Sequence, residues 1–78
     1  MNKDELKDHL FSVIQDRTAG LKVIEIAEML DIKQPTATRL LQRQHETFSV
    51  DKLIQYCQKL GVSVEYKIGG KLIKRGDE

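Results

Sequence analysis

The chain has 78 residues, a length that allows one domain, because two cores of half this size would each bury too little apolar surface to fold. Hydrophobic residues make up 40% and charged residues 32%, which is too apolar for a disordered chain, and the formal net charge is +1. A single cysteine excludes an internal disulfide and a zinc site of several thiolates. The chain has no apolar run of the roughly 20 residues that a membrane helix needs, and its polar first residues are unlike a signal peptide. We therefore expect one cytoplasmic domain over residues 1–78, without a membrane partner.

Apolar residues that recur every three or four positions predict three helices in the first half of the chain. The first begins at Asn2, which is placed to form a capping pair with Glu5, and ends near residue 16. The second and third helices cover residues 21–30 and 34–42 and are separated by a short turn.

A fourth helix is predicted between Ser49 and Gly61. The Ser49 side chain can accept a hydrogen bond from the first turn, and Phe48 can pack on Leu53 as a hydrophobic staple. Gly61 offers the left-handed residue that commonly ends a helix.

The hydrophobic period then changes from helical to two, which predicts a β element within residues 62–75. The apolar residues of this alternating stretch are Val62, Val64, Tyr66 and Ile68. Gly69 and Gly70 leave two alternatives open. In one, they form a two-residue hairpin turn that sets Tyr66 opposite Ile73 and Glu65 opposite Lys74. In the other, the residues after Gly70 form a solvated tail.

Residues 23–42 have the pattern of a helix-turn-helix, in which a protein places the second helix in the DNA major groove. Such a motif needs a small residue at the helix crossing, an apolar residue in the turn and inward anchors on the second helix. The predicted buried set is Ile26, Ala27, Leu30, Ile32, Ala37 and Leu40. Residues 32–45 include three cationic side chains and no acidic residue, so positive charge is concentrated where DNA would lie.

The stretch VIEIAEMLDIKQPTATRLLQ (23–42) resembles the helix-turn-helix of the phage Cro and repressor (XRE) family. The stretch FSVDKLIQYCQKLGVSVEYKI (48–68) is similar to the capped helix and terminal strand of small XRE proteins of the HigA antitoxin type. The resemblance covers roughly residues 18–68. It implies a mainly α fold: a four-helix Cro/repressor-like domain with a short C-terminal β-strand or hairpin.

Three residues depart from the family pattern, which often has Gln, Gly, and Ser or Thr where this chain has Val23, Asp31 and Lys33. Val23 cannot donate a hydrogen bond to a phosphate, so that contact is lost unless Lys22 or a backbone N–H replaces it. Asp31 can adopt the left-handed conformation that the turn requires. Lys33 is a poor helix cap but adds a positive charge.

The resemblance places three side chains on the groove-facing side of the third helix: Gln34, Thr38 and Arg39. Their chemistry suits base readout, because Arg can bind guanine and Gln can bind adenine in bidentate fashion, while Thr can contact a thymine methyl group. The residues expected to contact phosphates are Lys33, Thr36, Arg43 and Ser49.

We therefore expect a sequence-specific repressor that binds a double-stranded DNA operator as a homodimer, with the apolar edge from Val62 to Ile68 as the dimer interface. The resemblance also implies an antitoxin with a cognate toxin partner, while a plain repressor fits equally well. The alternative from another functional class is a protein-interaction module that no longer binds DNA, which Val23 favours.

Catalysis, metal binding and cofactors are not expected from this sequence. His9 and His45 have no Cys or carboxylate at ligand spacing, and we expect them to be exposed. Cys57 lies on the apolar stripe of the fourth helix without a base partner. The serines lack a nucleophile motif.

Overall fold

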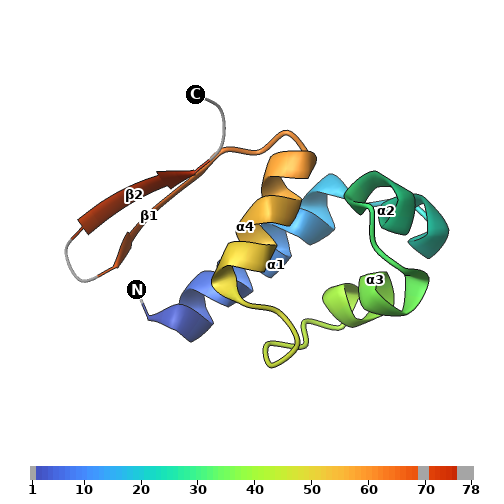
Figure 1. Cartoon of the computed structure of the whole chain (residues 1–78), viewed down its shortest axis with the longest axis horizontal. Helices are drawn as coiled ribbons and strands as arrows, with labels where there is room; N and C mark the ends of the chain where they lie inside the picture. The colour runs from blue at the N-terminus through green and yellow to red at the C-terminus, as the bar shows by residue number, and fades with distance from the viewer. Residues whose placement is uncertain (1, 69–70, 76–78) are drawn as a thin grey trace.

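The computed structural model describes residues 2–68 and 71–75, with side chains described for residues 2–63. It consists of four helices followed by two strands (Figure 1). In chain order these are α1 (Lys3–Arg17), α2 (Val23–Leu30), α3 (Gln34–Leu41), α4 (Val50–Lys59), β1 (Val64–Ile68) and β2 (Lys71–Arg75). The order of helices agrees with the prediction, and their bounds differ from it by a few residues at most.

Three local signals in the sequence set the helix ends. The Asn2 side chain accepts a hydrogen bond of 2.8 Å from the Glu5 backbone N–H, and that of Ser49 accepts one of 3.1 Å from Lys52. Gly61 has a φ of 80° just after the end of α4. These observations confirm the predicted caps, which satisfy backbone groups that a helix end leaves without partners.

The start of α2 differs from the prediction, because the helix begins at Val23 and not at residue 21. Lys22 is its N-cap, and its backbone N–H donates a hydrogen bond of 2.9 Å to the Glu25 carboxylate. Glu25 therefore supplies the half of a capping box that reaches back from the third helical position. Leu21 lies before the helix and packs against the core from there.

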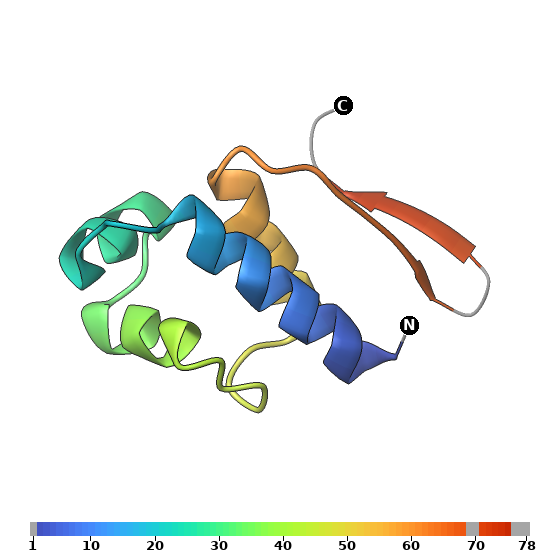
Figure 2. The ribbon, with the colours of Figure 1, turned by 180° about the vertical axis from the view of Figure 1, so that it is seen from behind.

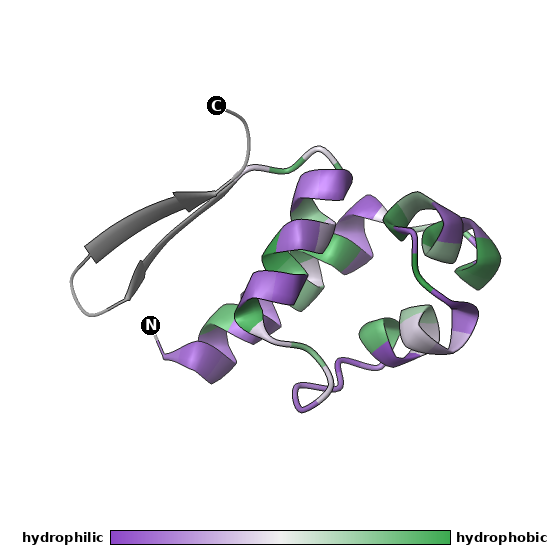
Figure 3. Cartoon of the chain, viewed as in Figure 1, coloured by the Kyte–Doolittle hydropathy of each residue, from purple (hydrophilic) through white to green (hydrophobic). Residues whose placement is uncertain are grey.

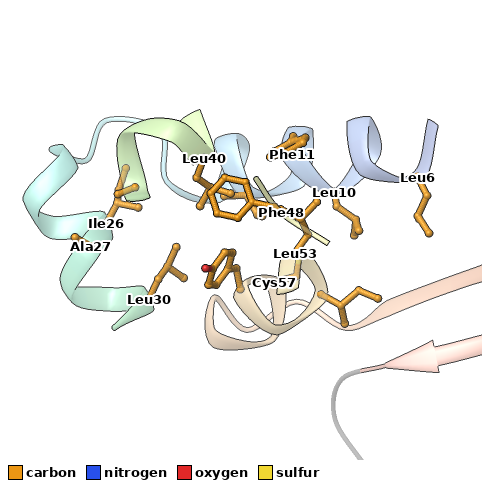
Figure 4. Close-up of a cluster of buried hydrophobic side chains, with 14 residues drawn as sticks. Leu6, Leu10, Phe11, Ile26, Ala27, Leu30, Leu40, Phe48, Leu53 and Cys57 are labelled. Carbon is orange, nitrogen blue, oxygen red and sulfur yellow. The ribbon is translucent and has the colours of Figure 1, made fainter. Parts of the chain in front are cut away.

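One hydrophobic core joins the four helices, and α1 and α4 pack side by side along it (Figures 1 and 4). Figure 4 shows Phe48, from the loop before α4, lying among Leu10, Leu40 and Leu53. Phe48 is 3% exposed, and its ring meets the Phe11 ring edge to face at a centroid distance of 6.1 Å. The residue predicted as a staple therefore joins α4 to α1 as well.

The strands β1 and β2 pair antiparallel, with Tyr66 opposite Ile73 and Glu65 opposite Lys74. This is the register expected for a two-residue connection, and Gly69 and Gly70 themselves lie outside the described residues. The hairpin lies at one end of the molecule and the pair α2–α3 at the other (Figures 1 and 2). The candidate site is therefore remote from the hairpin.

Candidate nucleic-acid interface

The turn between α2 and α3 is closed by backbone geometry. Asp31 has φ 56° and ψ 48°, the left-handed conformation predicted for it. The N–H of Ile32 donates a hydrogen bond of 2.9 Å to the carbonyl of Ala27, so the chain reverses within a few residues of the end of α2. The turn fixes the direction in which α3 leaves α2.

The inward face of this motif is buried as predicted, with one exception. Five of the six predicted residues are at most 4% exposed: Ile26, Ala27, Leu30, Ala37 and Leu40. Ile32 is half-buried and packs against the core from the turn. Its position between the helices, at the edge of the motif, explains why it is not fully covered.

The outward face of α3 carries the three predicted base-reading residues. Gln34, Thr38 and Arg39 are all exposed, and the turn of about 100° per residue places them within one broad arc of the helix, away from buried Ala37 and Leu40. The same side includes Pro35 and Gln42, which sequence reasoning did not single out. The signal that identifies them is the spacing of four residues, from Pro35 to Arg39 and from Thr38 to Gln42.

The predicted phosphate-contacting residues lie on α3 or at its N-terminus, on the loop that follows it and at the start of α4. Lys33 is exposed at the N-terminus of α3, where its side chain makes no capping hydrogen bond. Thr36 is half-buried, and Ser49 caps α4 with an exposed side chain. The prediction that Lys33 is a poor cap is confirmed, and its ammonium group is not engaged in capping.

Arg43 lies in the hydrophilic loop that follows α3 (Figure 3). Its guanidinium is bound to α1: Nη2 lies 2.8 Å from Gln15 Oε1 and 3.0 Å from Ser12 Oγ, and Nε lies 3.2 Å from the same Gln15 oxygen. Gln15 in turn donates a hydrogen bond of 2.9 Å to the carbonyl of Leu41, the last residue of α3. Sequence reasoning missed Gln15, because no local signal connects residues 26 to 28 positions apart.

His45 also differs from the expectation of an exposed histidine. Its Nε2 lies 2.7 Å from Asp8 Oδ1, its ring centroid lies 5.3 Å from that of Phe11, and its side chain is 30% exposed. The Lys7 ammonium donates a hydrogen bond of 2.8 Å to the His45 carbonyl. The loop after α3 is therefore attached to α1 at two places, through Arg43 and through His45.

The residues predicted for the dimer interface are described in part. Val62 is half-buried and packs against the core of its own chain, so part of its apolar surface is already covered. Val64, Tyr66 and Ile68 lie on β1, and their side chains fall outside the described ones.

Cys57 is fully buried, and burial raises the pKa of its thiol to about 11. The thiol is therefore protonated at neutral pH, which makes it a poor nucleophile.

Across the residues with described side chains, no three His, Cys, Asp or Glu side chains come together as metal ligands. No helix in the described part of the chain is long and apolar enough to cross a membrane.

A family model described as a helix-turn-helix domain matches residues 2–69, which includes all four helices and β1. No match was found among curated proteins or among solved structures. Since the matched region covers most of the chain, this protein belongs to the helix-turn-helix domain family.

Proposed function

We propose that this protein is a sequence-specific DNA-binding transcriptional regulator that inserts α3 into the major groove. The observation that carries this proposal is the division of α3 into two faces. Ala37 and Leu40 are buried in the core, while Gln34, Thr38 and Arg39 are exposed together on the opposite side. A short helix held in this way by a tight turn presents its polar side chains as a rigid unit, which is what base readout requires.

Each exposed residue of α3 has a proposed role in base readout. Arg39 donates two hydrogen bonds to O6 and N7 of a guanine, and Gln34 pairs with the N6 and N7 of an adenine. Thr38 contacts a thymine methyl group. Gln42 extends the same side by one turn and gives the site a further polar group.

The proposed phosphate contacts are Lys33, Thr36 and Ser49. Lys33 brings a positive charge to the N-terminus of α3, where it adds to the positive end of the helix dipole. Arg43 is also predicted to belong to this group, and its exposed guanidinium keeps its charge although Nε and Nη2 are hydrogen-bonded to α1.

The proposed functional unit is a homodimer, because one short helix makes too few base contacts for tight binding. The hairpin is the proposed interface, since a two-stranded sheet has edges that a second copy can pair with. The hairpin and α3 lie at opposite ends of a molecule 38 Å long. Two copies joined end to end would place their α3 helices farther apart than the roughly 34 Å of one DNA turn. We therefore propose an angled dimer.

Within this class, we propose the role of an operon repressor in the cytoplasm. The resemblance of residues 48–68 to XRE proteins of the HigA type supports an antitoxin role as a special case, with a cognate toxin as a second partner. A toxin partner would be recovered with the tagged protein when the neighbouring gene is expressed beside it.

One observation favours a second candidate, a protein-interaction module that does not bind DNA. Val23 is half-buried and packs against the core, so the first position of α2 offers no side-chain donor to a phosphate. Such a module would keep the fold and lose the DNA contact.

Titration of the purified protein against its own promoter DNA and a scrambled duplex, at several salt concentrations, separates the two candidates. A regulator binds the promoter more tightly than the scrambled duplex, and its affinity falls as salt rises. An interaction module binds neither duplex at moderate salt.

A further inference from the structure

The loop after α3 begins with a residue, Arg43, whose backbone is in the left-handed conformation. Arg43 has a φ of 55°, and among the described non-glycine residues only Asp31 shares this left-handed region. Side chains other than glycine, asparagine and aspartate are uncommon there. From this conformation the Arg43 side chain reaches α1, where its guanidinium is hydrogen-bonded.

Gln15 of α1 receives that side chain and the end of α3 together. Its Oε1 accepts from Arg43 at 2.8 and 3.2 Å, and its Nε2 donates to the Leu41 carbonyl at 2.9 Å. Only one orientation of the amide fits, because its oxygen must accept and its nitrogen must donate. Ser12, one helical turn earlier, accepts from the same guanidinium at 3.0 Å. A closed ring of contacts thus runs from α3 through the loop to α1.

These contacts act where α3 has little support of its own. The helix has eight residues, and a helix this short is held by tertiary packing more than by its own hydrogen bonds. The last carbonyls of a helix have no partner within it, and Leu41 is the final residue of α3. Gln15 supplies that carbonyl with a donor from another element.

We infer that Gln15 and Arg43 form a brace, defined as these two side chains with Ser12, that fixes the C-terminal end of α3 for base readout. This inference rests on the proposed DNA-binding function. Gln15 and Arg43 are positioning residues in this account, because they act on the DNA through the orientation of α3. Nε and Nη2 of Arg43 are hydrogen-bonded to neutral groups of α1, so its main role in this inference is to fix the loop, while its exposed guanidinium keeps its charge.

The salt dependence of DNA binding distinguishes the brace from a phosphate contact. Loss of one phosphate contact lowers the slope of log affinity against log salt by about 0.9. Gln15→Ala opens the brace and keeps every charge, so it should leave the slope unchanged. It should lower affinity for the promoter site by about 2- to 10-fold, as expected for a net hydrogen-bond loss, and leave scrambled DNA nearly unaffected. Gln15→Ala, Arg43→Ala and the double variant are compared with wild type.

Two control variants each remove a guanidinium or an amide side chain at a position outside the brace. Arg17→Ala deletes an exposed charge near the end of α1, and Gln55→Ala deletes an exposed amide on α4. The brace predicts that the double variant binds the promoter no more weakly than the worse single variant, because each substitution already opens the ring. The two controls keep the specificity of wild type.

A slope reduced by about 0.9 in Arg43→Ala, together with wild-type promoter affinity in Gln15→Ala, assigns Arg43 to a phosphate contact and overturns the brace. Unchanged promoter binding by both variants overturns it as well. If wild type shows no promoter preference, the proposed function itself fails, and that result is seen before any variant is made.

Amide hydrogen exchange of residues 42–44 in the free protein keeps the test independent of folding defects. Exchange at these residues rises in Gln15→Ala if the brace holds the loop, while the core amides of α1 stay protected.

Discussion

The ammonium group of Lys59, the last residue of α4, donates a hydrogen bond of 2.8 Å to the carbonyl of Leu30, the last residue of α2. A cation at this place satisfies a carbonyl at the helix end and opposes the negative end of the α2 dipole. The contact joins α2, the first helix of the helix-turn-helix, to α4. It therefore holds the helix-turn-helix to the rest of the domain.

Replacing Lys59 with Met should lower the free energy of unfolding by about 1 kcal/mol, since Met keeps the length of the side chain and loses the charged donor. Urea unfolding at low ionic strength measures the change. Lys52→Met is the matched control, because it removes an exposed lysine from the same helix. Equal stability of the two variants would show that the Lys59 contact contributes nothing measurable.

The buried thiol of Cys57 predicts a loss of stability at alkaline pH. Its pKa is about 11 in the folded protein against a usual value of 9.0, so the unfolded chain loses the proton first as pH rises. The stability that this group contributes is complete below pH 9 and is lost between pH 9 and pH 11, by roughly 2 kcal/mol.

Unfolding of wild type and Cys57→Ala between pH 8 and pH 11 checks this prediction. Tyr56, whose pKa burial also raises, is present in both proteins, so the difference between them isolates the thiol. The variant is less stable at pH 8, because it leaves a cavity, and the gap narrows as pH rises. A gap that stays constant across this range would contradict a raised thiol pKa.

Arg39→Ala should weaken binding to the promoter site by about 5- to 150-fold, the equivalent of 1–3 kcal/mol for one bidentate base contact. Binding to scrambled DNA should fall much less, because Arg39 makes no specific contact to a base there. Competition titrations with the two duplexes give the ratio of the affinity for the promoter site to the affinity for scrambled DNA. Equal losses on both duplexes would remove Arg39 from the base-reading group.

Lys33→Ala should weaken binding to both duplexes alike and lower the salt slope by about 0.9, as expected for one lost phosphate contact. The side chain lies at the N-terminus of α3 without a capping hydrogen bond, so its removal should leave the helix intact. Circular dichroism checks that point. A change in specificity without a change in slope would mean that Lys33 contacts a base.

Val64→Lys should convert the proposed dimer to a monomer if β1 forms the interface, because it places a charge on the strand that a second copy would pair with. Sedimentation velocity measures the mass directly. Ser63→Lys, at an exposed position just before β1, is the control for added charge alone. A dimer that survives Val64→Lys would require an interface outside β1.

Local signals explain how much of this fold was predictable. Asn2, Ser49 and Gly61 act within three or four residues of their own position, so the sequence alone identifies the ends of two helices. The buried residues of α2 and α3 follow from helical spacing in the same way. The turn conformation of Asp31 was predictable because the resemblance supplied its role.

The contacts that fix α3 against α1 were not predictable from the sequence. Gln15 lies 26 residues from Leu41, and Asp8 lies 37 residues from His45, so neither pair leaves a periodic or motif signal. Arg43 was interpreted by its charge alone, which gives no information about where its guanidinium points. The half-buried position of His45 follows from the packing of its ring near Phe11, which becomes visible only after the loop is placed.

The central claim is tested most directly by NMR chemical shifts of the backbone amides in the isotope-labelled protein. The shifts are compared with and without a short duplex taken from the promoter segment that the protein shields from nuclease. The account predicts that the largest changes fall on Gln34, Thr38 and Arg39 and on the neighbouring turn, while β1 and β2, as the proposed dimer interface, change little. Changes centred on exposed Ile24 and Met29 of α2, or none at all, would contradict the claim that α3 reads DNA.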